Sequence, residues 1–232
     1  MKVLMYGAEI AKVFFGDLLA ILDEKGVGYD LVEPNGPEAL AEDSKDHEAI
    51  ITFFPLDGKL VNALAPSVKG IVVTSIGFDT IDVAAANQRG ILVCNIPDYC
   101  TEEVALHTVT LILAGLRNLC QYDRYVRAGK WDNRGMVLGR PRHRLSTLTM
   151  GFMGFGRIGQ KVAGMMTGFG VKIIAYDPYV PDTVFASMNV ERAGAPDEVY
   201  EKSDILSVCM LLNDETYHLI NRDSIAKMKD GV

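Results

Sequence analysis

The chain has 232 residues, of which 49% are hydrophobic and 23% are charged, so it can bury a core of ordinary size. This length is long for one α/β domain and short for two complete ones. A net charge of −7 and a pI near 5.1 argue against nucleic acid as the main partner, because neutralising phosphates requires a basic surface.

Neither a membrane span nor a metal site is predicted. The most apolar run, residues 104–116, is 13 residues long and contains His107, whereas a spanning helix needs about 20. Residues 1–7 resemble a first β-strand and lack the features of a signal peptide. Free thiols in a cytoplasmic protein are the simplest interpretation of the cysteines, which show no CxxC spacing. The four are Cys94, Cys100, Cys120 and Cys209.

Strand and helix patterns alternate along the first hundred residues. Short apolar runs predict five strands, at residues 3–6, 29–32, 49–54, 71–74 and 91–94. Helical spacing predicts helices over 11–25 and 37–44. Apolar strands separated by helices are typical of a parallel sheet that is covered on both faces. We therefore predict a doubly wound α/β domain over residues 1–98.

One long helix is predicted over residues 101–127. Thr101 is a plausible N-cap, and Glu102 and Glu103 suit the positive end of the helix dipole. The first half is apolar on nearly every side, so we expect burial at an interdomain or dimer interface.

A polar, basic connection follows over residues 129–144. A solvated loop is favoured there over a phosphate-binding site. Its arginines are Arg134, Arg140, Arg142 and Arg144.

A second α/β pattern continues to the end of the chain. Strands are predicted at residues 147–152, 171–176 and 205–210, and helices at 157–167, 196–202 and 222–229. Between the first strand and its helix stands a GxGxxG motif, formed by Gly154, Gly156 and Gly159. The motif alone is weak, but a strand, a helix and a second strand surround it in the order of a dinucleotide-binding βαβ unit.

Each glycine of the motif has a physical task in such a unit. The first permits the tight turn, the second lets the backbone approach a pyrophosphate, and the third lets the helix pack closely on the strand. The helix N-terminus directs unpaired N–H groups and its positive dipole end at the phosphates. Asp177 ends the second strand, eighteen residues after Gly159, where a carboxylate binds ribose hydroxyls and repels the extra phosphate of NADP. The alternative is a solvated carboxylate before Pro178.

A second candidate site is the loop of residues 74–82, which follows the fourth strand. Ligands bind beyond the carboxyl ends of parallel strands, and Gly77 would let backbone N–H groups converge on a small anion. Taken alone, a glycine turn with Asp79 or Thr80 capping the next helix is the simpler interpretation.

These motifs together resemble those of the D-isomer-specific 2-hydroxyacid dehydrogenases, including phosphoglycerate dehydrogenases and the C-terminal-binding proteins. The resemblance covers nearly the whole chain and follows the order of the family. It is carried by residues 75–82, 90–105, 154–159, 176–179, and 203–205 through 218–221.

The resemblance implies a flavodoxin-like substrate domain over residues 1–98 and an NAD-binding Rossmann domain over 99–232. It implies hydride transfer between nicotinamide and a D-2-hydroxy acid or 2-keto acid, with dimerisation through the cofactor domain. The substrate carboxylate would be held by the backbone of Ile76 and Gly77. The cofactor contacts would be Gly154, Gly156, Arg157, Ile158, Gly159, Asp177, Met210, Leu211 and Thr216.

Two departures from the family stand out. Many members have His-x-Pro where this chain has Cys209-Met210-Leu211, but contacts there are mostly through the backbone. The family's catalytic Arg, Glu and His match positions beyond Val232, so no catalytic residue is assigned within the 232 residues. An ending inside an expected core strand favours a fragment of a longer protein.

The histidines offer no replacement for that catalytic set. His107 is expected to be a satisfied core or interface residue, and His47, His143 and His218 lie in polar contexts without a carboxylate at suggestive spacing.

Two functional hypotheses follow. The first is an NAD-dependent oxidoreductase of 2-hydroxy acid metabolism, and the alternative is a non-catalytic, NAD-sensing dimeric module like the C-terminal-binding proteins. Residues 53–56, after the third strand, either line the substrate pocket or belong to the ordinary core.

Overall fold

The computed structural model describes residues 1–131 and 143–232 of the chain. These residues form two compact units, residues 1–99 and 100–232. No helix of the described residues is both long and apolar enough to span a membrane.

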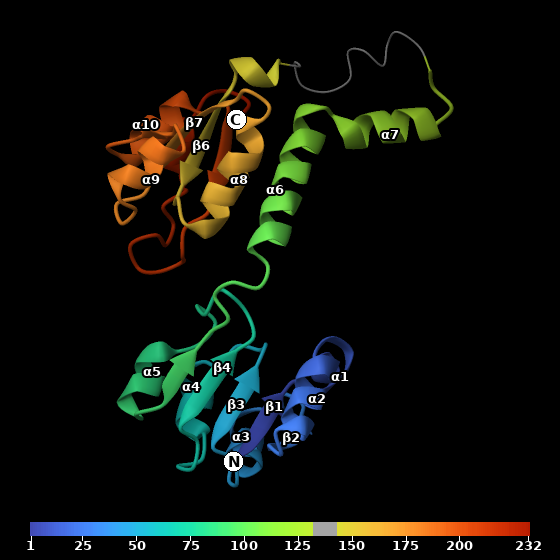
Figure 1. Ribbon diagram of the computed structural model, residues 1–232, viewed down its shortest axis with the longest axis vertical. Helices are drawn as coiled ribbons and strands as arrows, with labels where there is room; N and C mark the ends of the chain where they lie inside the picture. Colours follow the sequence, from blue (N-terminus) through green and yellow to red (C-terminus); the bar gives the residue numbers. More distant parts are fainter. Residues whose placement is uncertain (132–142) are drawn as a thin grey trace. The chain divides into compact units, whose positions relative to one another are not determined.

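The first unit is one parallel sheet with helices on both faces (Figure 1). Its strands are β1 (Lys2–Tyr6), β2 (Gly28–Val32), β3 (Ala49–Thr52), β4 (Gly70–Val73) and β5 (Leu92–Cys94). Its helices are α1 (Ala8–Phe14), α2 (Gly16–Glu24), α3 (Pro37–Asp43), α4 (Gly58–Ala63) and α5 (Val83–Gln88). The strand order β2-β1-β3-β4-β5 is the flavodoxin-like order, which confirms the predicted fold class.

Alternation along β1 explains why this sheet needs two layers of helices. Leu4 and Tyr6 point into a core with residues of α3, α4 and α5, whereas Val3 and Met5 point into a core with residues of α1 and α2. A strand that is buried on both faces has no polar side, which is why its sequence is continuously apolar.

The second unit is also a covered parallel sheet, with strand order β8-β7-β6-β9. Its strands are β6 (Thr149–Met153), β7 (Lys172–Tyr176), β8 (Glu191–Arg192) and β9 (Ile205–Val208). Its helices are α6 (Thr101–Leu116), α7 (Leu119–Arg127), α8 (Arg157–Thr167), α9 (Asp182–Ser187), α10 (Pro196–Lys202) and α11 (Arg222–Ala226), with a 3-10 turn, η2, at Leu145–Thr147. Helices α6 and α8 pack on one face and α10 packs on the other (Figure 1).

Side chains on these strands again divide between two cores. Phe152 and Ile173 meet α6 and α8, while Met153 and Ile174 meet Val199 and Tyr200 of α10. Helix α10 comes so close that a Cβ on Gly151 would lie 2.7 Å from Val199 Cγ1. The chain order of these strands reverses between β6 and β9, which marks their carboxyl ends as the binding edge of the sheet.

Several sequence predictions about helices are wrong. The helix predicted over 11–25 begins at Ala8 and is divided at Phe15 into α1 and α2. The helix predicted over 101–127 is broken at Asn118, whose φ of 53° is left-handed, so it forms α6 and α7. Cys100, not Thr101, is the N-cap of α6.

Other differences concern helix caps and exposure. Asp82 caps α5 in place of Asp79 or Thr80, because its carboxylate accepts the Ala85 N–H at 2.9 Å. The first half of α6 is not buried all round in the single chain, since Leu106 is 58% and Leu111 60% exposed. Of the arginines of the basic loop, Arg134, Arg140 and Arg142 lie outside the described residues, and Arg144 is exposed.

Candidate functional site

The glycine loop connects β6 to α8 at the carboxyl edge of the second sheet. Gly154 has a φ of +85°, and its N–H donates to the carbonyl of Tyr176, the last residue of β7, at 2.9 Å. A Cβ on Gly154 would lie 2.7 Å from Met210 N and 2.8 Å from Met210 Cα. The ends of β6, β7 and β9 therefore meet at a position that admits only glycine.

The other two glycines of the loop have different surroundings. A Cβ on Gly156 would meet nothing within 4 Å, so this part of the backbone faces open space. A Cβ on Gly159 would lie 3.0 Å from the Gly154 carbonyl oxygen and 3.6 Å from the Phe152 ring. Helix α8 thus packs closely on β6 while the loop leaves room on its outer side for a ligand that approaches the backbone.

The N-terminus of α8 offers a site for an anion. Gly156 is the N-cap, and no side chain caps this end of the helix. The first N–H groups of a helix have no intrahelical acceptor, and the helix dipole adds positive potential there. Arg157 is the first residue of the helix and is exposed, while Ile158 is half-buried. This combination suits the pyrophosphate of a dinucleotide.

Asp177 follows β7 and joins the glycine loop to its own turn. Its Oδ2 accepts the Phe155 N–H at 2.8 Å, and its Oδ1 accepts the N–H groups of Tyr179 at 2.9 Å and Val180 at 3.2 Å. A carboxylate has about four lone-pair positions, so acceptor capacity remains for a ribose hydroxyl. The sequence pattern identified Asp177 as a candidate ribose-binding acid, but it did not predict that the same carboxylate holds the glycine loop through Phe155.

The loop after β9 reaches the same edge through a hydrogen bond of the Cys209 N–H to the Met153 carbonyl at 2.7 Å. The Thr216 hydroxyl donates to the Leu211 carbonyl at 2.6 Å, which folds the loop back on itself. The structure therefore brings Met210 beside Gly154, while the Thr216 hydroxyl is occupied within its own loop.

Tyr179 and Glu215 join the loop after β7 to the loop after β9. The sequence pattern assigned neither residue a role. The Tyr179 hydroxyl donates to Glu215 Oε2 at 2.8 Å. The hydrogen bond and the charge of Glu215 both raise the pKa of Tyr179, so the phenol stays protonated at neutral pH. No sequence pattern at these positions would have paired them, because 36 residues separate them.

Cys209 follows β9, and its backbone lies next to Gly154. Burial raises the pKa of its thiol, and a contact of 3.3 Å with the Ser207 hydroxyl opposes this only in part. The thiol is therefore protonated at neutral pH, and a nucleophilic or metal-binding role is disfavoured. The described residues also contain no group of three or more His, Cys, Asp or Glu that could hold a metal ion.

The candidate substrate loop belongs to the first unit and follows β4. The Asn95 amide donates to the Ile76 carbonyl at 2.7 Å, and the Ser75 hydroxyl donates to the Gly77 carbonyl at 2.6 Å. Within the described part of the chain, the N–H groups of Ile76 and Gly77 have no acceptor. The loop thus has its carbonyls occupied and two amide donors available, which suits an anion.

The aromatic pair before α4 is divided between surface and core. Phe53 is 51% exposed, whereas the Phe54 ring packs against Gly7 and lies edge-on to Tyr6 at a centroid distance of 6.4 Å. Leu56 is fully buried. Core packing accounts for Phe54 and Leu56, and the exposed Phe53 and Pro55 remain candidates for a pocket wall.

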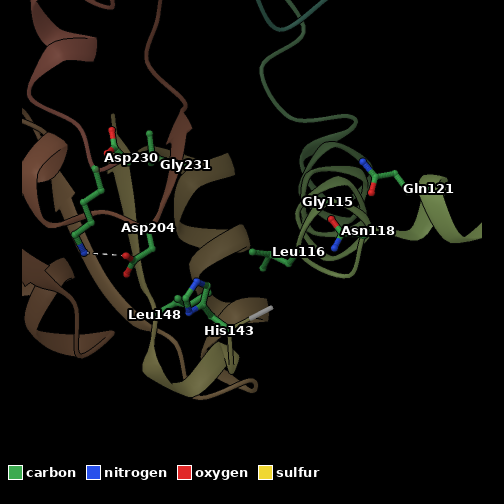
Figure 2. A pocket seen from close by; sticks show the side chains of 11 residues that line it. Gly115, Leu116, Asn118, Gln121, His143, Leu148, Asp204, Asp230 and Gly231 are labelled. Atoms are coloured by element: carbon green, nitrogen blue, oxygen red, sulfur yellow. Dashed lines mark hydrogen bonds and ion pairs between the residues drawn. The ribbon is translucent and has the colours of Figure 1, made fainter. Parts of the chain in front are cut away.

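A pocket of about 500 Å³ lies elsewhere in the second unit (Figure 2). Leu116, Asn118 and Gln121 line one side, and His143, Leu148, Asp204 and residues 229–232 line the other; none is a predicted site residue. Lys229 Nζ donates to Asp204 Oδ1 at 2.9 Å, and Asp204 Oδ2 accepts the Thr149 N–H at 2.8 Å. These contacts are structural, and we assign no ligand to the pocket.

The second unit matches a known family over most of its length. Residues 109–232 match the family described as D-isomer specific 2-hydroxyacid dehydrogenase, NAD binding domain. The chain belongs to this family. That assignment confirms the resemblance inferred from the motifs, and it places the glycine loop, Asp177 and the loop after β9 within the NAD-binding domain of a 2-hydroxyacid dehydrogenase.

Individual relatives support the assignment. The chain is 37% identical over 201 residues to a glyoxylate reductase from Thermofilum pendens, which covers 84% of this chain and 58% of that protein. It is 39% identical over 170 residues to a hydroxypyruvate reductase from Thermotoga maritima, covering 72% of this chain and 52% of that protein. The chain thus spans between half and three-fifths of these relatives.

Solved structures agree with the sequence comparison. The crystal structure of a D-lactate dehydrogenase from Aquifex aeolicus, complexed with NAD and lactic acid, superposes with a TM-score of 0.83 at 29% identity; the match covers 99% of this chain and 67% of that one. A glyoxylate reductase from Paecilomyes thermophila gives a TM-score of 0.85 at 28% identity, covering 100% of this chain and 71% of that one.

The histidines of this chain differ from the sequence prediction in two respects. His47 is buried, with its Nε2 3.1 Å from Asp30 Oδ2, so it does have a carboxylate neighbour. The hydrogen bond from Lys2 to Asp30 is the main cause that holds the pKa of Asp30 below its ordinary value, and the charges of Lys2 and His47 act in the same direction. His107 is exposed, so the core interpretation of that residue is wrong.

Proposed function

We propose that the chain carries the cofactor site of an NAD-dependent oxidoreductase that interconverts 2-keto acids and D-2-hydroxy acids. The observation that carries the proposal is the glycine loop between β6 and α8, fastened to Asp177 at the end of β7. The bound cofactor supplies or accepts the hydride. The protein has to bind it, orient it and exclude water around it.

The residues of the second unit divide this work between them. The backbone around Gly156 and the N-terminus of α8 hold the pyrophosphate, with Arg157 adding positive charge. Asp177 receives the adenosine ribose, and its negative charge disfavours a 2′-phosphate. Met210, Leu211 and Thr216 form the opposite wall through the loop that follows β9.

The substrate is proposed to be a small 2-keto or 2-hydroxy acid, whose carboxylate is held by the Ile76 and Gly77 N–H groups. Reduction also needs a proton donor, and removing a positioned acid typically lowers a rate by about 10²–10⁴. Among the described residues His107, His143 and His218 are exposed, and none is hydrogen-bonded to a carboxylate. We expect residues 1–232 alone to bind the cofactor and to turn over keto acids slowly.

Cofactor binding is the direct test. NADH and NADPH are titrated separately, and binding is followed by NADH fluorescence and by calorimetry. We expect tighter binding of NADH and a narrower difference in the Asp177→Ala variant. Equal or tighter binding of NADPH by the unaltered protein would contradict the assignment of Asp177.

Activity is tested by following NADH absorbance with glyoxylate, pyruvate and hydroxypyruvate. We expect residues 1–232 to show no appreciable turnover of these keto acids, because none of the exposed histidines among the described residues is hydrogen-bonded to a carboxylate as a positioned proton donor would be. Sustained turnover at a typical enzymatic rate of about 1 s⁻¹ or more would show that the proton donor lies among the residues described above.

We also propose a cytoplasmic homodimer that contacts through α6. Leu106 and Leu111 of α6 are exposed in the single chain, and association through this helix would remove apolar side chains from water. The four cysteines are free in the structure, which suits the reducing cytoplasm.

A further inference from the structure

A cationic side chain lies beside the proposed ribose site. Arg192 ends β8, and its Nη2 donates to the Asp177 carbonyl at 3.2 Å. Its Nη1 forms an ion pair with Asp182 Oδ1, at the start of α9. Its guanidinium carbon lies 5.1 Å from the centroid of the Phe185 ring. Three separate contacts therefore hold this guanidinium next to the backbone of Asp177.

The same aromatic ring connects Arg192 to the glycine loop. Phe185 is buried and stacks on Phe155 with a centroid distance of 5.1 Å and an interplanar angle of 24°. The Phe155 N–H in turn donates to the Asp177 carboxylate. Arg192 is thus fixed to the framework that positions both the loop and the acid, and is not a freely moving surface residue.

The register of the sheet places Arg192 at its binding edge. Strands β7 and β8 are parallel, with Ala175 opposite Arg192, so Asp177 lies only two residues beyond that pair. Ligands of such sheets bind beyond the carboxyl ends of the strands. A phosphate on the 2′-hydroxyl of an adenosine ribose bound at Asp177 would lie near Arg192. An arginine close to the ribose is the group that accommodates such a phosphate in NADP-binding proteins.

The local charges decide whether this part of the site accepts or rejects a 2′-phosphate. Asp177 and Asp182 carry two negative charges and Arg192 one positive charge, and Asp182 occupies an N–H of the guanidinium. A 2′-phosphate would have to displace Asp182 and would also face Asp177. Arginine binds phosphate well only when its fork of N–H donors is available.

We propose that Asp182 is a second determinant of cofactor choice, because it holds Arg192 in an ion pair and so withholds it from the 2′-phosphate of an adenosine dinucleotide. This inference rests on the proposed cofactor site. It assigns Asp177 to direct repulsion of the phosphate and Asp182 to occupation of the arginine that would otherwise attract it.

The experiment compares Asp182→Asn with a matched control, Glu191→Gln. Glu191 is the neighbour of Arg192 in β8 and pairs with Lys202 at 2.7 Å. Its substitution by glutamine removes one negative charge, as Asp182→Asn does, but it leaves the ion pair of Asp182 with Arg192 in place. The side chain of Asp182 is 82% exposed, so its replacement by asparagine leaves the core intact. Binding of NADPH, NADH, 2′,5′-ADP and 5′-AMP is measured for each protein.

We expect D182N to bind NADPH and 2′,5′-ADP about three- to tenfold more tightly, the size of one exposed charge-assisted contact. The affinity of D182N for 5′-AMP should stay within about twofold of that of the unaltered protein. In E191Q the affinities for 2′,5′-ADP and 5′-AMP should both stay within the same twofold range. The gain should disappear in D182N/R192Q, because the phosphate then lacks the guanidinium.

Two results would overturn the inference: a gain in D182N no larger than in E191Q, or a gain that persists in D182N/R192Q. The NADH titration separates this from the proposed function. Failure of the unaltered protein to bind NADH would reject the cofactor site itself. Normal NADH binding without an NADPH gain in D182N would reject only the role of Asp182.

Discussion

Gly154 and Gly156 stand two residues apart in the glycine loop, yet alanine at Gly154 should chiefly lower the stability, whereas alanine at Gly156 should chiefly lower the affinity for NADH. Gly154 has a φ of +85°, whereas Gly156 has a φ of −73°, which any residue adopts. A Cβ on Gly154 would lie 2.7–2.9 Å from backbone atoms of Met210 and Cys209, and one on Gly156 would meet nothing within 4 Å.

The structure supplies the magnitudes. An L-residue in left-handed backbone costs about 1–2 kcal/mol. Overlap with backbone that cannot rotate away adds about 1–3 kcal/mol. We therefore expect Gly154→Ala to lower the free energy of unfolding of the second unit by about 2–4 kcal/mol, after allowing for the smaller entropy of the unfolded alanine chain. Gly156→Ala should leave that free energy within about 0.5 kcal/mol of the original, because the smaller entropy of the unfolded alanine chain is offset by the poorer N-cap that alanine makes for α8.

Gly156→Ala, which should hardly change the stability, should weaken the binding of NADH. The methyl group of Gly156→Ala would project into the open side of the loop, where the backbone is expected to approach the pyrophosphate. We expect the affinity for NADH to fall at least tenfold, or about 1.4 kcal/mol. Urea denaturation followed by circular dichroism measures the stability, and fluorescence titration measures the affinity. Unchanged NADH affinity in Gly156→Ala, or unchanged stability in Gly154→Ala, would refute this reasoning.

Three further predictions concern other contacts of the second unit. Burial opposes ionisation of Asp204, but hydrogen bonds from Lys229 and the Thr149 N–H outweigh it and lower its pKa. The stabilisation is therefore present above the ordinary carboxyl pKa of about 3.9 and is lost as the pH falls through the lowered value. The D204N variant should be less stable than the original protein near pH 7 and should lose less stability in acid. Parallel acid-denaturation curves for the two proteins would argue against this. E215Q should lower the pKa of Tyr179, measured by absorbance of the phenolate, and an unshifted titration would mean that their hydrogen bond does not form in solution. Leu106→Glu should convert a dimer into a monomer by light scattering, and a dimer that survives would exclude this face of α6 from the contact.

The sequence determined the features that depend on neighbouring residues. The helix over residues 157–167 was predicted with the bounds that α8 has, because a glycine motif, an apolar stripe and a following strand all lie within one continuous segment. Helix α10 was likewise predicted at Pro196–Lys202, since proline at N1 and acidic residues in the first turn mark its start. The covered parallel sheets followed from strands without a polar face.

Only the tertiary structure decided which distant groups meet. The break at Asn118 was not predicted, because Arg117 and Asn118 interrupt the apolar residues no more than a solvated helix face would, and the two-residue strand β8 carries too few residues to show a period. Asp177 was found as a strand-end acid, but its bond to Phe155 joins residues 22 apart in sequence. Arg192 gave no signal at all, because its partners Asp177 and Asp182 reach it only after β7 and β8 have paired. Local patterns specify elements and turns, whereas the charge environment of a site is set by loops from several strands that converge on one edge of a sheet.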